Sequence, residues 1–312
     1  MEFPQTFLTH RYAPPGSRLS RRNLLGWSAA GTLAAAAGLL TAWTANSEYS
    51  PLSPVLFEDL FAGRSLNRNR WNPYICDNNS NGWPWLTQPG VAVASSAIGA
   101  ENGPNATYDL PSAIGVDNGL TLRTYRGTRA IGYSWTGSVI CSRPTSNDFG
   151  SGPVHTAGFT FADARVEVQA KMPDLTGGQW PSIWFLPAPG GRGAEIDLFE
   201  GGYLADGISP SRLMAVKLFG RGNQQKFVDC GTDLSAAYHT YAMEYRQGSS
   251  IRFFFDGSAV CTYTRNVPTG PYFLILSNGI ASARTAAWHT QVGDATPAAN
   301  LMQVSSVRIL SI

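Results

Sequence analysis

The chain of 312 residues has few charged side chains, since Asp, Glu, Lys and Arg make up only 14%. It has four His and four Cys, and no Cys-x-x-Cys pair or His–Cys spacing that would indicate zinc. We therefore expect neither a metal nor a cofactor. After residue 46 no stretch has helical periodicity, and no internal repeat or low-complexity segment is present. The composition excludes a disordered chain, and the missing periodicity disfavours a helical protein.

The chain is instead rich in aromatic residues (12%), with 33 Gly and 20 Pro. Aromatics and turn formers with few charges favour β-structure. The clearest alternation is in 159–172, where Val166 and Val168 point to one face and Arg165 and Glu167 to the other. Many short strands predict an all-β sandwich or barrel. We expect strands at 55–61, 119–123, 138–142, 159–172, 179–187, 195–200, 213–219, 240–245, 251–255, 259–263, 272–276 and 304–310.

Residues 1–45 predict an export signal. Arg21 and Arg22, in the run SRRNLL, resemble a twin-arginine motif, and the uncharged segment 24–43 follows. That segment could instead remain as a membrane anchor, because twenty apolar residues can just span a bilayer. Its many Ala and Gly favour the cleaved signal, and hence a secreted or extracytoplasmic protein without stable membrane insertion. Residues 46–54 are expected to form a linker and 55–312 a single domain.

Removal of residues 1–45 takes away four of 23 basic residues and one of 21 acidic residues, which leaves 19 against 20. The remaining domain gives no electrostatic reason to expect nucleic acid as a partner. We expect a monomer. The four cysteines could form two disulfides in any of three pairings or remain as buried thiols; they are Cys76, Cys141, Cys230 and Cys261.

The hexapeptide 195–200, EIDLFE, places three carboxylates among three apolar residues. In a regular strand Glu195 and Asp197 share a face, and Glu200 points to the other one. A β-bulge between Asp197 and Glu200 would bring all three together. The two glutamates are then four strand positions, roughly 13 Å, apart. Their side chains would bring the carboxyl groups to about 5 Å, the spacing of retaining glycosidases. The alternative is a solvated acidic face on an ordinary strand.

The segment 178–187, GQWPSIWFLP, followed by EIDLFE, resembles glycoside hydrolase family 16, in its laminarinase-like branch with the E-x-D-x-x-E spacing. The resemblance extends over about 55–312. Weaker matching segments occur in the family's order at 57–71, 164–173, 238–245, 255–257 and 304–309.

This resemblance implies a concanavalin-like antiparallel β-sandwich, or jelly roll, with a substrate cleft across its concave sheet. It implies retaining hydrolysis of internal β-glycosidic bonds in a polysaccharide. Glu195 would be the nucleophile and Glu200 the general acid and then base. Asp197 would orient Glu195 and raise the proton affinity of Glu200.

Four further residues are candidates for substrate binding. Trp180 and Trp184 could stack on sugars or be ordinary core aromatics. Arg165 could reach the nucleophile or cap a strand edge. Lys217 lies where family members usually carry His, which puts the usual substrate preference in doubt; His239 aligns with a different, structural His.

Many family members bind a structural calcium, but the usual acidic residues near the two termini are replaced here by Leu60 and Ser305. We therefore expect no calcium site. The leading hypothesis is a secreted endo-β-1,3-glucanase. The alternatives are a non-catalytic carbohydrate-binding protein on the same fold, and a galactan hydrolase or transglycosylase, with an acidic glycan also open through Lys217.

Overall fold

The computed structural model describes residues 53–71, 93–94, 106–108, 113–126, 135–144, 158–188, 194–220, 222–281 and 285–312. The predicted export signal, most of the predicted linker and Cys76 lie outside them. The chain divides into two units, Met1–Ser47 and Glu48–Ile312, and all the described residues belong to the second. In the described part of the chain, none of the helices has the length and apolar character needed to cross a bilayer.

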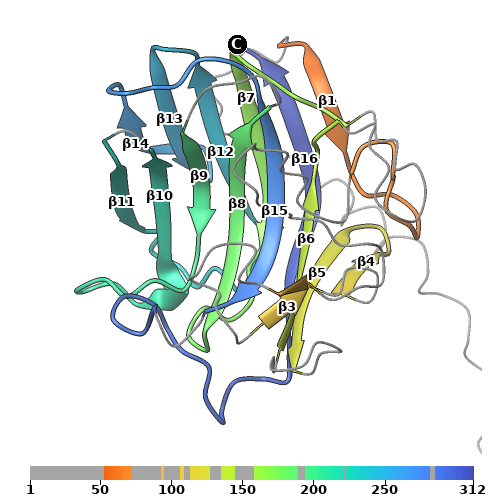
Figure 1. Ribbon diagram of the computed structural model, residues 1–312, viewed down its shortest axis with the longest axis vertical. Helices are drawn as coiled ribbons and strands as arrows, with labels where there is room; N and C mark the ends of the chain where they lie inside the picture. The colour runs from red at the N-terminus through yellow and green to blue at the C-terminus, as the bar shows by residue number, and fades with distance from the viewer. Residues whose placement is uncertain are drawn as a thin grey trace, which may run out of the picture. The chain divides into compact units, whose positions relative to one another are not determined.

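The described strands form a β-sandwich with almost entirely antiparallel pairing, as the sequence predicts (Figure 1). The front sheet in Figure 1 contains, in spatial order, β11 (Gln224–Asp229), β10 (Leu213–Phe219), β9 (Glu195–Glu200), β8 (Gln179–Pro187), β15 (Tyr272–Ile280) and β6 (Trp135–Cys141).

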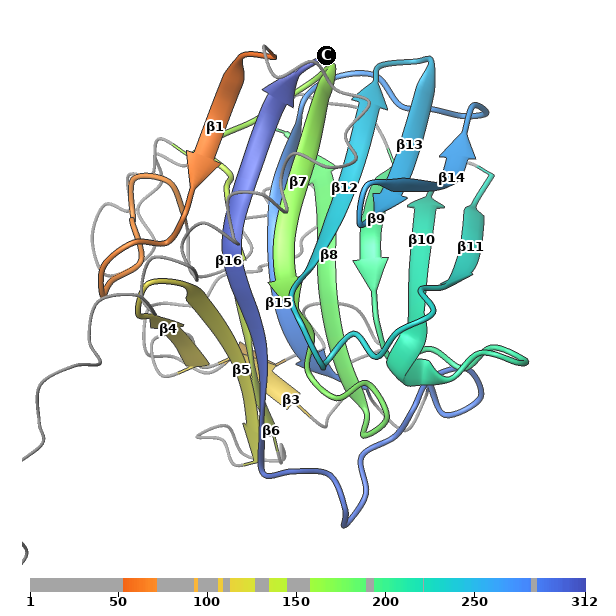
Figure 2. The ribbon, with the colours of Figure 1, turned by 180° about the vertical axis from the view of Figure 1, so that it is seen from behind.

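The back sheet faces the viewer in Figure 2. Its strands, in spatial order, are β14 (Ser258–Tyr263), β13 (Ser250–Phe255), β12 (His239–Arg246), β7 (Ala164–Lys171), β16 (Ala299–Ser311) and β5 (Leu120–Arg126), with β1 (Val55–Asp59) also paired to β16. Pairing of β5 with β6 joins the two sheets. The short strands are β2 (Val93–Ala94), β3 (Ala106–Tyr108), which runs parallel to β6, and β4 (Ile114–Val116).

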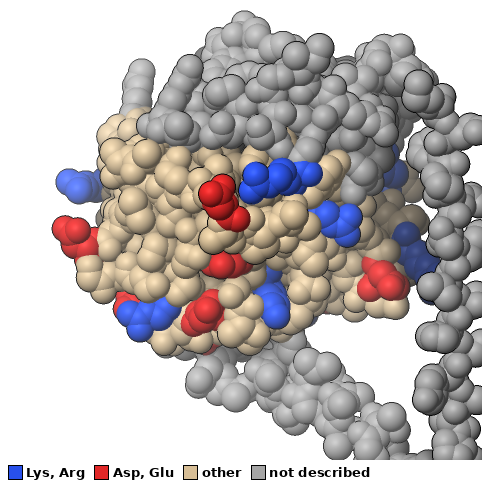
Figure 3. Space-filling view, turned by 90° about the horizontal axis from the view of Figure 1, so that it is seen from below, with Lys and Arg blue, Asp and Glu red and all other residues tan. Residues whose placement is uncertain are grey.

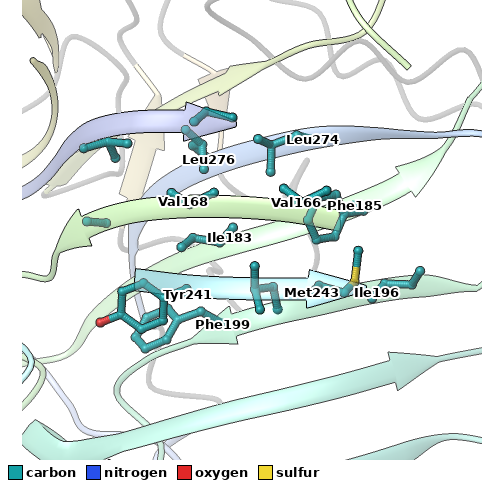
Figure 4. Packing of buried hydrophobic residues seen from close by; sticks show 14 of the residues in the cluster. Val166, Val168, Ile183, Phe185, Ile196, Phe199, Tyr241, Met243, Leu274 and Leu276 are labelled. Atoms are coloured by element: carbon teal, nitrogen blue, oxygen red, sulfur yellow. The ribbon is translucent and has the colours of Figure 1, made fainter. Parts of the chain in front are cut away.

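The hydrophobic core lies between the two sheets and follows the alternation of the sequence. Val166 and Val168 of β7 are fully buried in it, as are Ile183 and Phe185 of β8. Figure 4 shows these side chains with those of β9, β12 and β15. Because the core buries one face of each strand, the other face of the front sheet points away from the back sheet and can carry functional side chains.

Every strand expected from the sequence is present, and β8, β9 and β10 have the expected bounds. The sequence did not predict β2, β3, β4 or β11. The last of these, QQKFVD, is an edge strand whose side chains are half-buried or exposed, so it carries no alternating apolar pattern.

Two cysteines of the described residues, Cys230 and Cys261, are free thiols, and Cys141 is buried. Burial, with the negative charges of Asp229 and Asp256, raises the pKa of Cys230 to about 12. This thiol is therefore a weak nucleophile at neutral pH.

Candidate active site

The acidic strand β9 contains the predicted bulge. On the β8 side, Ser182 faces Glu200 and Trp184 faces Asp197, and the register shifts between these pairs. The extra residue returns Glu200 to the side of Asp197, while Leu198 and Phe199 both enter the core. We call the side of β8–β11 that faces away from the core the acidic face; it carries Glu195, Asp197 and Glu200.

The carboxyl group of Glu200 receives three polar contacts from neighbouring elements. Trp180 Nε1 of β8 donates to Oε1 at 2.9 Å. Tyr203 donates its hydroxyl to Oε2 at 3.1 Å, and Lys217 Nζ of β10 forms an ion pair with the same oxygen. Lys217 Nζ also contacts the Tyr203 hydroxyl and lies 4.2 Å from the centre of its ring. All three neighbours are donors, which is the pattern that a carboxylate accepts.

Tyr203 is held in place by a segment more than eighty residues further along the chain. Its ring stacks on Trp288 at 5.1 Å between centroids, and its backbone forms a bridge with His289. Leu204 N donates to Trp288 O at 2.9 Å, which fixes the register of the two segments. The surroundings of Glu200 therefore depend on a contact between distant parts of the sequence.

His289 is fully buried behind Trp180, with 4.7 Å between the ring centroids. Its Nε2 lies 3.0 Å from Gly201 O and its Nδ1 2.8 Å from Thr290 O. Burial lowers the pKa of His289, against the opposing effect of these carbonyl groups. The ring fixes the turn that follows Glu200 and supports the indole that binds it.

Asp197 is the most buried of the three acids, with 2% of its surface exposed. Burial first, and then the charges of Glu200 and Glu195, raise the pKa of Asp197 well above its usual range; Lys217 opposes the shift. Lys217 is the cross-strand partner of Asp197. Lys217 thus acts on both Glu200 and Asp197, and a proton on Asp197 relieves its repulsion with the two glutamates.

The two candidate sugar platforms, Trp180 and Trp184, do lie on the acidic face, but each is only 8% exposed. Trp184 Nε1 donates to Ser277 Oγ of β15 at 3.2 Å. Trp180 is packed against Tyr203, Trp288 and His289. Both indoles therefore offer little open ring surface, and the contacts that they make hold the site together.

The structure does not bring Arg165 to the carboxylates. Arg165 belongs to β7 of the back sheet and points away from the core, opposite to Val166. Its guanidinium bonds Glu244 at 3.0 Å and Glu167 at 2.7 Å, and it lies 4.5 Å from the centre of the Phe254 ring. The expectation that it reaches the nucleophile is corrected, because the two sheets present their outer faces in opposite directions.

The other residues singled out in the sequence lie away from the acidic face. His239 Nδ1 is 2.8 Å from Asp256 Oδ2 on the back sheet. Leu60 is exposed beyond β1, and Ser305 Oγ contacts Gln169 of β7. In the view of Figure 3, acidic and basic side chains of the described residues are interspersed.

The sequence did not single out Tyr203, Trp288 or His289. They lie outside the strands and share no motif, so no local signal pointed to them. Tyr203 follows Glu200 by three residues, and this spacing is only a weak indication of a role in the site.

The fold and the site define an antiparallel β-sandwich with a bulged acidic strand on one outer sheet face. The model for glycosyl hydrolases family 16 matches residues 113–299, more than half of the chain. The protein belongs to this family.

Similar solved structures have the same fold. The laminarinase catalytic domain of Thermotoga maritima MSB8 has a TM-score of 0.62 and 16% identity, over 83% of this chain and 98% of that one. The endo-β-1,3-glucanase of Pyrococcus furiosus has a TM-score of 0.60 and 18% identity, over 83% and 94%. The β-glucanase of Bacillus licheniformis has 0.56 and 18%, over 82% and 98%.

Sequence similarity to curated proteins is restricted to a short stretch. The β-glucanase of Bacillus subtilis (strain 168) is 46% identical over 52 residues, which are 17% of this chain and 21% of that protein. The β-glucanase of Brevibacillus brevis is 36% identical over 58 residues, 19% and 22% of the two chains. The chain thus spans about a fifth of the length of the curated relatives that it matches.

Proposed function

We propose that this protein is a retaining endo-glycosidase that hydrolyses internal β-glycosidic bonds of a polysaccharide, with β-1,3-glucan as the first candidate. The observation that carries the proposal is the bulge at Leu198, which places Glu195, Asp197 and Glu200 on one face of β9. Two carboxyl groups on the same face supply both groups that retaining hydrolysis needs. The substrate is suggested by proteins of similar structure, among them a laminarinase and an endo-β-1,3-glucanase.

The proposed first step starts from the form in which Glu200 is protonated. Glu195 attacks the anomeric carbon while Glu200 gives its proton to the leaving glycosidic oxygen. The C–O bond breaks, and a glycosyl ester forms on Glu195. Glu200 is left as a carboxylate, a form suited to the donors of Trp180, Tyr203 and Lys217. In the second step Glu200 takes a proton from water, and the water oxygen displaces Glu195 from the sugar.

Asp197 contributes to both steps through its neighbours. It lies between the two glutamates along β9 and, with its raised pKa, can remain neutral while Glu195 carries the charge needed for attack. Lys217 supplies a positive charge to the cluster. Because its ammonium group already contacts Glu200 and Tyr203, Lys217 gives little support to an acidic glycan as substrate.

The test is hydrolysis of laminarin, mixed-linkage β-glucan and a galactan by the purified protein, with reducing ends measured over time. We expect cleavage of laminarin, and proton NMR of the first product should show the β-anomer. An initial α-anomer would contradict retention. Cleavage of the galactan alone would support the alternative substrate, and binding without cleavage of any of the three would identify a carbohydrate-binding protein.

Export through residues 1–45 is part of the proposal. It rests on Arg21 and Arg22 before the uncharged segment 24–43. Replacing both arginines with lysine should retain the protein in the cytoplasm of the producing cell, as measured by fractionation. Unchanged export of this variant would contradict a twin-arginine signal.

A further inference from the structure

Phe219 is an aromatic residue on the acidic face that is open to solvent, with 57% of its surface exposed. It is the last residue of β10. Met214, Val216 and Leu218 of this strand enter the core, so Lys217 and Phe219 point to the opposite, acidic face. Trp180 and Trp184 are both buried, and Phe219 has the open ring surface that these two lack.

Phe219 lies beside one of the proposed catalytic residues. Its direct cross-strand partner on β9 is Glu195, the proposed nucleophile. Side chains paired in this way have Cβ atoms about 5 Å apart. A sugar ring bound against Phe219 would therefore lie next to the carboxyl group that attacks the anomeric carbon.

The backbone under Phe219 is firmly held. The next residue, Gly220, approaches Ala194 so closely that an added Cβ would lie 2.6 Å from the Ala194 side chain. Gly220 N also donates to Asn223 Oδ1 at 2.8 Å, and Tyr272 donates its hydroxyl to Ala194 O at 2.7 Å. The strand ends are thus fixed, while none of the described residues makes an aromatic ring contact with Phe219.

One polar side chain suited to a sugar lies on the same side of the sheet as Phe219. Gln225 of β11 is exposed and faces Lys217 across the strand pair, on the same side of the sheet as Phe219. An open aromatic ring beside an amide fits the two surfaces of a pyranose, which has an apolar face of C–H groups and a rim of hydroxyls. A lone exposed apolar residue would need no explanation, but one paired with a candidate nucleophile does.

We propose that Phe219 is a stacking platform for a neutral hexose unit of the glycan, adjacent to Glu195. The proposal rests on the proposed function and assigns the substrate-binding role to a residue with open ring surface. The platform supplies binding energy and takes no part in bond making or breaking.

The test compares Phe219→Ala, Phe219→Leu and Phe219→Trp with the wild type on whichever glycan the wild type cleaves. We expect Phe219→Ala to raise KM about tenfold, or about 1.4 kcal/mol, with kcat within about twofold. Phe219→Leu keeps apolar area without a flat ring and should resemble the Ala variant, whereas Phe219→Trp should restore the wild-type KM. Leu301→Ala is the matched control, because Leu301 is 39% exposed on the back sheet.

Two failures are distinguishable. If the wild type neither cleaves nor binds any of the glycans, the proposed function is wrong, and the role of Phe219 as a platform is wrong too. If the wild type is active and Phe219→Ala has the KM of Leu301→Ala, the platform alone is wrong. A wild-type KM in Phe219→Leu would replace stacking with simple hydrophobic contact and would also overturn the proposal.

Discussion

Lys217 Nζ forms an ion pair with Glu200 Oε2 although the direct strand partner of Lys217 is Asp197. The ammonium group therefore lies between two acids of the cluster. Both side chains of the ion pair are largely buried, with 14% and 12% exposed. Removal of one partner would leave charge in a poorly hydrated site.

Lys217→Met should destabilise the protein by about 1–3 kcal/mol at pH 7, since Glu200 and Asp197 lose a neighbouring cation in a largely buried site. The loss should shrink towards pH 4, where protons can replace the missing charge. Urea unfolding at both pH values measures this difference. An equal loss at both would mean that packing of the aliphatic side chain, and not its charge, is what matters.

Tyr203→Phe keeps the ring that stacks on Trp288 and removes only the hydroxyl that contacts Glu200. We expect a stability change of about 1 kcal/mol or less, together with a fall in kcat of about tenfold or more, because Glu200 is less well oriented. Steady-state kinetics and thermal unfolding test the two parts. Full activity would show that Trp180 and Lys217 are sufficient to position Glu200.

Glu195→Gln and Glu200→Gln should each lower kcat by about a thousandfold or more, because each removes a group that is proposed to act in the transition state. Both substitutions keep the shape of the side chain, so unfolding temperatures should remain near that of the wild type. Glu58→Gln, at an exposed position of β1, is the control. Activity near the wild-type level in either active-site variant would end the role assigned to that residue.

Asp197→Asn tests the raised pKa of Asp197. Between the usual value of 3.8 and the raised one, the folded protein holds a proton that the unfolded chain has released. Wild-type stability should therefore fall as pH rises through this window, by up to about 1.4 kcal/mol per pH unit from this group. The Asn variant should lack this component, so its stability relative to the wild type should rise with pH in chemical unfolding. Parallel curves would contradict the burial effect.

The sequence predicted the part of the site that depends on strand alternation. In a regular strand Glu200 would point to the face opposite Asp197, and a β-bulge was expected to return it to the same face. The extra residue at Leu198 confirms that inference. Alternation also predicted that Arg165 leaves the core, but it does not say which of two sheets holds a strand. That depends on long-range pairing, and for this reason the sequence left open whether Arg165 reaches the nucleophile, which it does not.

Exposure was harder to predict than position. Trp180 lies on the predicted face, yet it is covered by Trp288 and His289, which are more than a hundred residues away in sequence. Tyr203 and these two residues come from irregular segments without periodic patterns. Phe219 ends a strand whose other residues are buried, and only the three-dimensional packing shows that it remains open.

The turn after Glu200 offers a matched pair of glycine substitutions. Gly202 and Gly207 both have positive φ, +85° and +76°. An added Cβ at Gly202 would lie 2.3 Å from His289 Cε1 and 2.4 Å from Gln179 O, whereas at Gly207 nothing lies within 4 Å. Both alanine variants share the backbone strain, about 1–2 kcal/mol, but only Gly202→Ala adds a clash with a buried ring and a carbonyl group.

We expect Gly207→Ala to cost about 1 kcal/mol and to retain activity. Gly202→Ala should cost at least about 3 kcal/mol and lower kcat, because the displaced His289 no longer supports Trp180 beside Glu200. Chemical unfolding and kinetics on the same preparations separate the two effects. Equal stabilities would show that the turn can move away from His289, and the support assigned to that ring would then be wrong.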